Sequence, residues 1–284
     1  MHRSSNPASE YLEVAGRRLE VRRIATSENE GAKAGALDRG AGAAGVPTLV
    51  FLHEGLGSVA LWKDFPDRLS RALGWPALVY SRLGYGGSDP APLPRPVTFL
   101  EDEALDALPR LLEAAGLDDV VLVGHSDGAS IALVHAAAFP LPPLGAVRAV
   151  IAEAPHVTVE EVTLTSIRRA GEAYRDGDLR RRLARYHADV DGAFWGFHDV
   201  WLDPAFASWT IEDRLGRIRA PVLVIQGADD PYGTLRQVES IRARSGGPVE
   251  ILVLEPPCGH SPHAERPDLV LAAMATFLRR IGAS

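Results

Sequence analysis

The sequence has very little cysteine, no long hydrophobic run and no excess of basic residues. Its single cysteine, Cys258, excludes a disulfide within the chain. No apolar run approaches the ~20 residues that a membrane span requires, and residues 1–10 lack the apolar region of a signal peptide. The formal net charge of −7 at pH 7 does not favour nucleic-acid binding, which needs a clustered basic surface. We therefore expect a cytoplasmic protein with neither a nucleic-acid nor a membrane partner.

Short apolar runs alternate with helical patterns along the 284 residues. The runs are residues 48–53, 77–81, 120–124, 147–152, 221–226 and 249–254, and helical patterns cover 100–115, 127–139, 238–244 and 267–281. Buried strands that alternate with helices predict an α/β fold with a mostly parallel, doubly wound sheet. Residues 11–24 predict a hairpin, and the Ala- and Gly-rich residues 26–46 predict a surface loop.

One long segment, residues 155–219, interrupts the alternation because it contains no convincing strand. We interpret it as a helical cap inserted into a core made of residues 1–154 and 220–284. The arginines between residues 168 and 185 alternate with acidic residues. A solvated helical face is the simpler interpretation, and a surface for an acidic substrate or acyl carrier is the alternative.

The segment Gly124-His125-Ser126-Asp127-Gly128 matches the pattern G-x-S-x-G, between an apolar run and a helical pattern. A serine on a sharp strand-to-helix turn needs a strained backbone, and glycines on either side avoid collisions there. The turn presents the hydroxyl above the sheet, next to the free N–H groups of a helix N-terminus. We predict that Ser126 is a nucleophile.

A serine nucleophile needs a base, and the base needs an acid that orients it. His260 follows the last predicted strand and is the expected base, with His263 as its rival. Two neighbouring aspartates, Asp229 and Asp230, follow the strand at 221–226, and Glu153 follows the strand at 147–152. The position after a strand leaves all three carboxylates open as the acid.

The chain resembles the α/β-hydrolase superfamily, in its serine-nucleophile branch with a helical cap. The likeness covers about residues 11–282 and rests on four segments, which are His53 to Ser58, Ser81 to Asp89, Gly124 to Gly128 and Gly259 to Pro267. The family's acid stands three residues after a glycine at a strand end, which implies Asp230. Its histidine follows a glycine, which implies His260. The chain departs from the family at Glu54, where glycine is usual, and at Ser81, where aspartate is usual.

An oxyanion hole needs two backbone donors that point at one place. We expect them to be the N–H groups of Asp127 and Gly55, with Leu56 as the alternative to Gly55. The side chains of Glu54 and Asp127 should point sideways, hydrogen-bonded to loop N–H groups. Otherwise they would select a cationic substrate or hold a water molecule.

Aromatic residues are frequent between residues 195 and 209, where they either line a substrate pocket or dock the cap on the core. We name Trp195 and Trp201 as candidate substrate contacts, together with Glu54 and Leu56. Cys258 is expected to fill space in the interior.

These expectations lead to a serine hydrolase that cleaves a small-molecule ester or related acyl bond, as a carboxylesterase or lactonase does. The same triad could instead cleave a carbon–carbon bond or transfer an acyl group. A ligand-binding sensor without turnover is the rival of another class, and cofactor-free lyase or oxygenase chemistry is a further one. No metal or cofactor is required by the motifs. Association into a homo-oligomer is left open.

Overall fold

An eight-stranded sheet forms the centre of the protein in the computed structural model, which describes residues 10–25, 46–140 and 146–282. Its strand order is β1-β2-β4-β3-β5-β6-β7-β8. The strands are β1 Glu10–Val14, β2 Arg17–Ile24, β3 Thr48–Leu52, β4 Ala77–Tyr80, β5 Asp119–His125, β6 Ala146–Glu153, β7 Val222–Gly227 and β8 Val249–Leu254. All neighbouring strands from β4 to β8 pair in parallel, so the predicted α/β fold with a mostly parallel sheet is confirmed.

The predicted N-terminal hairpin is present and forms one edge of the sheet. β1 and β2 pair antiparallel around Ala15 and Gly16, whose φ angles are 50° and 76°. β2 then pairs antiparallel with β4, which attaches the hairpin to the parallel strands. Of the loop predicted at residues 26–46, all but Val46 lies outside the described residues.

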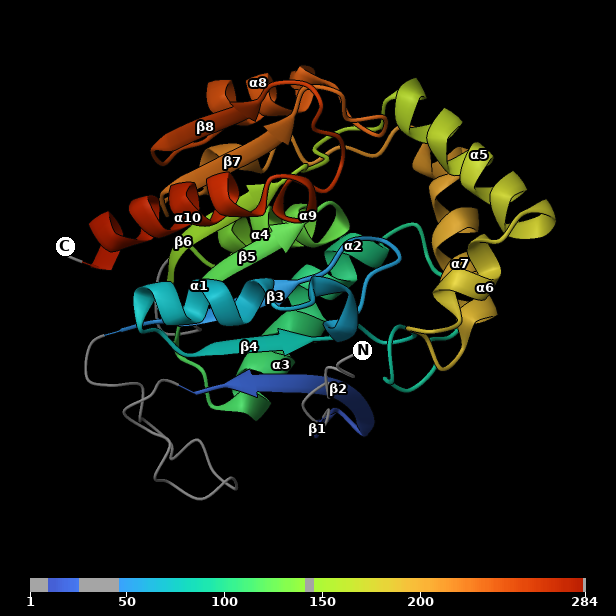
Figure 1. Ribbon diagram of the computed structural model, residues 1–284, viewed down its shortest axis with the longest axis horizontal. Helices are drawn as coiled ribbons and strands as arrows, with labels where there is room; N and C mark the ends of the chain where they lie inside the picture. The colour runs from blue at the N-terminus through green and yellow to red at the C-terminus, as the bar shows by residue number, and fades with distance from the viewer. Residues whose placement is uncertain (1–9, 26–45, 141–145, 283–284) are drawn as a thin grey trace, which may run out of the picture.

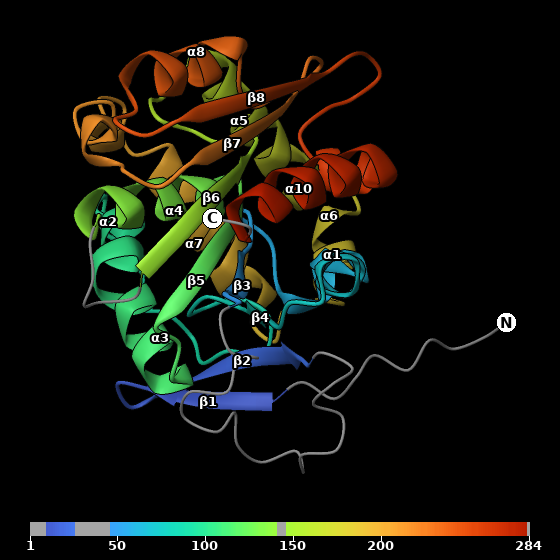
Figure 2. The ribbon, with the colours of Figure 1, turned by 90° about the vertical axis from the view of Figure 1, so that its left-hand side faces the viewer.

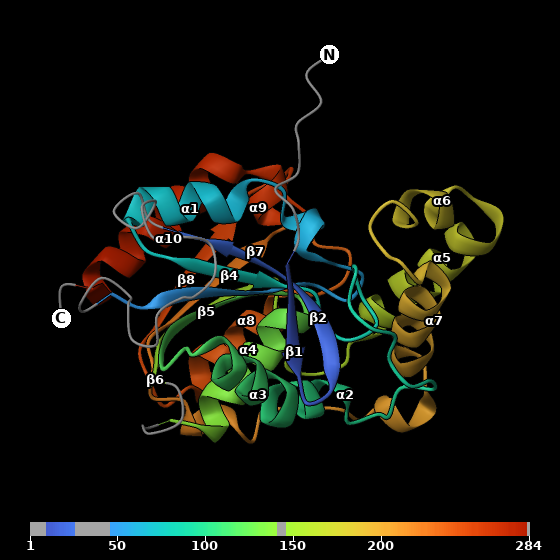
Figure 3. The same cartoon turned by 90° about the horizontal axis from the view of Figure 1, so that it is seen from below.

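Helices cover both faces of the sheet (Figures 2 and 3). α1 (Phe65–Leu73), α9 (Pro262–Glu265) and α10 (Pro267–Gly282) lie on one face, and α3 (Leu108–Ala115), α4 (Asp127–Ala138) and α8 (Leu235–Arg244) lie on the other. Each face has its own cluster of buried apolar side chains. α1 was not predicted from the sequence.

The helix predicted at residues 100–115 is interrupted by a π-helical turn. The turn, η3 (Glu103–Ala107), separates α2 (Phe99–Asp102) from α3. A π turn shifts the side chains that follow it around the helix axis. Glu103, within the turn, is buried, although glutamate is rarely buried without a partner.

The segment between β6 and β7 is helical and lies beyond the carboxyl ends of the parallel strands (Figure 1). Its main helices are α5 (Glu161–Asp176), α6 (Leu179–Leu183) and α7 (Val190–Trp201). Phe197, Val200 and Trp201 of α7 belong to the apolar cluster of the sheet, so α7 packs on the core. In the part of the chain that the structure describes, no helix is long and apolar enough to cross a membrane.

The arginines of α5 and α6 are exposed, and several form ion pairs with nearby acidic residues. Arg168 pairs with Glu161, and Arg180 pairs with Asp191 at 2.6 Å. Ion pairs of this kind between exposed side chains contribute little to stability. These contacts agree with a solvated helical face.

Candidate active site

Ser126 occupies a sharp turn between β5 and α4. Its φ of 54° and ψ of −118° are rarely adopted by residues other than glycine and cost about 1–3 kcal/mol. The flanking glycines allow the turn because their neighbours lie very close. A Cβ on Gly124 would collide with the carbonyl of Gly128, and a Cβ on Gly128 would collide with the carbonyl of Leu52. The local structure is therefore the strained strand-to-helix turn that the G-x-S-x-G spacing predicts.

Ser126, His260 and Asp230 form a continuous chain of hydrogen bonds. His260 Nε2 lies 2.9 Å from Ser126 Oγ, and His260 Nδ1 lies 2.9 Å from both Asp230 carboxylate oxygens. The Asp230 carboxylate also accepts hydrogen bonds from Gln226 Nε2 at 2.7 Å and from the Tyr232 N–H at 2.8 Å. The structure thus brings together the three side chains that the sequence singled out.

The environment of Asp230 keeps its carboxylate ionised although its side chain is only 1% exposed. Burial acts to raise the pKa of Asp230. The hydrogen bonds and charge of His260, followed by the contacts with Tyr232 and Gln226, outweigh burial and lower that pKa. An ionised acid at this position fixes the proton of His260 on Nδ1 and leaves Nε2 free to accept the proton of Ser126.

The rival candidates lie outside this chain of hydrogen bonds. Asp229 is exposed, and its backbone N–H donates to the carbonyl of Cys258. Glu153 is fully buried at the end of β6, where its Oε1 accepts from His263 Nδ1 at 2.8 Å and from the His263 N–H at 2.6 Å. Glu153 and His263 therefore form a second carboxylate–histidine pair with each other. Cys258 is buried, as expected.

The peptide between Glu54 and Gly55 is held firmly by its carbonyl. That oxygen accepts from His53 Nδ1 at 2.7 Å and from Arg82 Nη2 at 3.0 Å. Because the Arg82 N–H donates to His53 Nε2 at 2.9 Å, His53 must carry its proton on Nδ1. Burial, followed by the charge of Arg82, lowers the pKa of His53 and keeps the imidazole neutral. The Gly55 N–H, the predicted oxyanion donor, belongs to this fixed peptide.

The expectation that both carboxylates bind loop N–H groups is wrong for Asp127, which pairs with Arg82, whereas Glu54 faces His125 and also accepts from its own backbone N–H. Asp127 is 1% exposed, with Arg82 Nη2 at 3.4 Å from Oδ2 and Trp201 Nε1 donating to Oδ1 at 3.2 Å. Glu54 Oε2 lies 3.5 Å from His125 Nδ1. A buried carboxylate is costly unless it is paired, so the guanidinium of Arg82 beside Asp127 offsets that cost.

The structure separates the two tryptophans named as substrate contacts. Trp201 is 1% exposed, and its indole N–H is bonded to Asp127, directly beside the nucleophile. Trp195 instead contacts Tyr174 and Phe194 in an aromatic cluster within the α5–α7 segment. Leu56 is partly buried, and its carbonyl accepts from His187 Nε2 at 3.0 Å.

Three aromatic side chains near the site were not singled out from the sequence. Phe197 of α7 packs so closely on Gly55 that a Cβ there would collide with its ring. The rings of Tyr232 and His156 lie 4.7 Å and 5.8 Å from the His260 ring. Burial, followed by the charge of His260, lowers the pKa of His156 to about 3 and keeps it neutral. A signal for His156 was its place shortly after β6, at the strand's carboxyl end.

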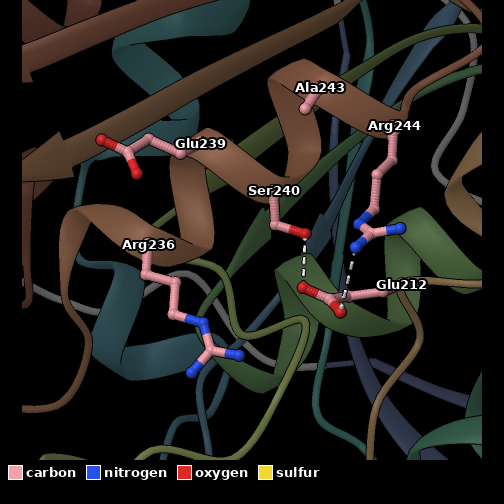
Figure 4. A pocket seen from close by; sticks show the side chains of 6 residues that line it. All are labelled: Glu212, Arg236, Glu239, Ser240, Ala243 and Arg244. Carbon is pink, nitrogen blue, oxygen red and sulfur yellow. Dashed lines mark hydrogen bonds and ion pairs between the residues drawn. The ribbon is translucent and has the colours of Figure 1, made fainter.

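A separate pocket of about 430 Å³ lies along α8 and contains none of the three triad candidates. It is lined by Glu212, Arg236, Glu239, Ser240, Ala243 and Arg244. The Glu212 carboxylate has partners within the protein, since it accepts a hydrogen bond from Ser240 Oγ at 2.6 Å and lies 3.7 Å from Arg244 Nη2 (Figure 4). Within the described residues, no three His, Cys, Asp or Glu side chains gather as a site for a metal ion.

Solved structures with the same fold span nearly the whole chain. A putative lipase from Acinetobacter baumannii AYE is 17% identical, with a TM-score of 0.76 over 97% of this chain and 92% of its own. An enol-lactonase from Burkholderia xenovorans LB400 is 19% identical, with a TM-score of 0.68 over 95% and 100%. Proline iminopeptidase from Mycobacterium smegmatis is 17% identical, with a TM-score of 0.68 over 97% and 99%. Identities this low establish the fold alone.

Sequence comparison adds the family. No curated protein matches the chain. A profile of the alpha/beta hydrolase family matches residues 49–273, which include every strand from β4 to β8 and the whole chain of hydrogen bonds at Ser126. The protein therefore belongs to the alpha/beta hydrolase family.

Proposed function

We propose that the protein is a serine hydrolase that cleaves a small-molecule ester or lactone through an acyl-enzyme. The observation that carries the proposal is the 2.9 Å contact between Ser126 Oγ and His260 Nε2 at a backbone strained to φ 54°. Strain of this kind persists where the surrounding structure enforces it, and it clusters at active sites. Two of the similar structures are named enol-lactonase and putative lipase, which agrees with this bond type.

The proposed first step forms the acyl-enzyme. Ser126 Oγ attacks the carbonyl carbon while its proton passes to His260 Nε2, and Asp230 stabilises the resulting imidazolium through Nδ1. The backbone N–H groups of Gly55 and Asp127 would stabilise the oxyanion. That of Asp127 is available because the first N–H groups of a helix, here α4, have no partner within it. His260 then gives its proton to the leaving oxygen as the carbon–oxygen bond breaks.

Water completes the cycle. His260 takes a proton from water as the water oxygen attacks the acyl carbon, and it returns that proton to Ser126 Oγ as the ester bond to the enzyme breaks. No side chain changes its net protonation over the whole reaction. The proposal also assigns residues 155–219 as a cap that contributes to substrate selection, supported by the packing of Phe197 on Gly55.

Hydrolysis of short p-nitrophenyl esters and simple lactones tests the proposal. We expect turnover by the native protein and a loss of about 10⁵–10⁶-fold in kcat for Ser126→Ala and for His260→Ala. Ser240→Ala, in the pocket along α8, is the matched control and should keep full activity. Product analysis in the presence of an alcohol separates hydrolysis from acyl transfer. An acyl-enzyme that forms once and persists would contradict the proposed hydrolase and favour a ligand-binding protein without turnover.

A further inference from the structure

His125, the residue before the candidate nucleophile, connects two loops of the site. Its imidazole is 1% exposed. Its Nε2 lies 2.7 Å from the backbone carbonyl of His260, and because a carbonyl only accepts, Nε2 must carry a proton. Its Nδ1 lies 3.5 Å from Glu54 Oε2, which is close enough for an ion pair although the geometry is not that of a hydrogen bond. The side chain of His125 thus joins the loop after β3 to the loop after β8.

The surroundings of His125 decide its charge. The groups that face it are Glu54 from the loop after β3, Glu153 at the end of β6, His260 and His263 after β8, Trp62 before α1, and His156 after β6. Burial acts to lower the pKa of His125. The two glutamates and the carbonyl of His260 outweigh burial and raise that pKa to about 9. His125 is therefore a cation at neutral pH. Burial acts to raise the pKa of Glu54, but His125 lowers it by more, so Glu54 is the anion that pairs with His125.

We infer that His125 is a positioning residue that keeps the imidazole of His260 at a fixed position relative to the Glu54–Gly55 peptide. The inference rests on the proposed function, in which His260 is the base and the Gly55 N–H is an oxyanion donor. Both groups lie on loops. The imidazole belongs to the residue whose carbonyl His125 contacts, and the Gly55 N–H belongs to the residue directly after Glu54.

Deprotonation should break the bridge at one end only. The single proton of neutral His125 must stay on Nε2 to serve the carbonyl of His260. Nδ1 would then present a lone pair to the Glu54 carboxylate, which is repulsive. The loop after β3 would lose its tie to the loop after β8. The imidazole of His260 could then move relative to the Gly55 N–H, which His53 and Arg82 hold in place through the Glu54 carbonyl.

Imidazole NMR titration tests the bridge without relying on catalysis. We expect the His125 signal, assigned by its absence in His125→Gln, to titrate near pH 9, the pKa that its surroundings produce. In Glu54→Gln, which keeps the size of the side chain, its pKa should fall by about one unit or more. The His260 signals should shift in the same variant. An ordinary pKa near 6.5 for His125, unmoved by Glu54→Gln, would overturn the inference even in a protein without activity.

Ester kinetics test the consequence for the proposed reaction. We expect kcat of His125→Ala to fall about 10²-fold, as misplaced catalytic groups do, with KM nearly unchanged. His125→Gln, which retains an N–H donor, should recover part of kcat. In the native protein kcat should decline as pH rises through about 9, and in Glu54→Gln the decline should begin at lower pH.

The matched control is His135→Gln on α4, a buried histidine that contacts the carbonyl of Ala104 and lies outside the site. It should keep the native kcat and pH profile. Should His125→Ala fail to fold by circular dichroism, the two glutamine variants decide. Native kcat and an unchanged alkaline profile in folded His125→Gln and Glu54→Gln would refute the inference. Absence of ester hydrolysis in the native protein would instead refute the proposed function. The NMR titration would then still decide whether His125 pairs with Glu54.

Discussion

Arg82 and Asp127 form a buried ion pair directly behind the nucleophile, with Nη2 of Arg82 3.4 Å from Oδ2 of Asp127. Their side chains are 0% and 1% exposed. The same Nη2 donates to the carbonyl of Glu54 at 3.0 Å. One guanidinium nitrogen therefore touches both segments that carry the proposed oxyanion donors. The pair ties the elbow, which is the sharp turn at residues 124–128, to the loop after β3.

Removing the guanidinium should destabilise the protein strongly. Arg82→Met leaves Asp127 buried without its cation, and a broken buried pair costs about 3–5 kcal/mol in the free energy of unfolding. Arg82→Met combined with Asp127→Asn removes both charges and should recover part of that loss. Urea denaturation of the two single variants and the double variant measures the coupling. Additive losses would show that Arg82 and Asp127 act independently.

Asp230→Asn should reduce kcat by about 10⁴-fold with little change in fold. The amide no longer accepts the Nδ1 proton of His260 in the same way, so the imidazole loses the tautomer that the reaction needs. Asp229→Asn is the matched control, because Asp229 is exposed and next in sequence. We expect native activity from it. Comparable losses in both variants would mean that Asp230 is not the specific partner of His260.

Stability should fall as pH rises from about 6.5 to about 9, because of His125. The folded protein holds the His125 proton up to a pKa of about 9, whereas the unfolded chain releases it near 6.5. The contribution is thus complete below 6.5, is lost as pH rises through 9, and amounts to about 3 kcal/mol. Urea denaturation across this range measures it. His125→Gln should flatten the slope, and an unchanged slope would contradict the raised pKa.

His156 should act in the opposite direction on the acid side. Burial lowers its pKa to about 3 in the folded protein. Below pH 6.5 the unfolded chain therefore binds a proton at His156 that the folded protein does not bind. Stability should therefore decrease as pH falls from 6.5 toward 3. Replacing His156 by Gln should weaken this decrease in denaturation measured at several acidic pH values. The prediction fails if the acid slope is the same in both proteins.

Gly124→Ala should disrupt the elbow. The added Cβ collides with backbone, the carbonyl of Gly128, which cannot swing aside as a side chain can. We expect about 3 kcal/mol or more of destabilisation, as overpacking against rigid groups produces. Gly216→Ala is the control, since the nearest atom to its Cβ would be the Arg244 carbonyl at 3.6 Å. Thermal unfolding of the two variants should differ clearly, and equal stabilities would show that the elbow can relax.

Much of the fold followed from the sequence because buried parallel strands and the helices between them have clear apolar patterns. All strands from β3 to β8 fall where those runs predicted them. α1 was not predicted, although Phe65, Leu69 and Leu73 follow one another at intervals of four residues, as on one face of a helix. The π turn within 103–107 was not predicted because the apolar spacing there still resembles that of an ordinary helix.

The candidate site was partly predictable for a different reason. Spacing identified Ser126 within G-x-S-x-G and left several carboxylates after strand ends open as the acid. The resemblance to the α/β-hydrolase superfamily then implied Asp230 and His260. The pairing of Glu54 with His125, and of Glu153 with His263, depends on which side chains face each other across separate loops. Spacing along the chain carries no such information, and that is why the partners of these carboxylates were missed.

Covalent labelling with a fluorophosphonate probe, mapped by mass spectrometry, tests the central claim most directly. The account predicts a single modified residue, Ser126, in the native protein, with labelling abolished in Ser126→Ala and strongly slowed in His260→Ala. Both variants should keep the native circular dichroism spectrum. A folded native protein that the probe leaves unmodified, or that it modifies elsewhere, would contradict the assignment of Ser126 as an activated nucleophile.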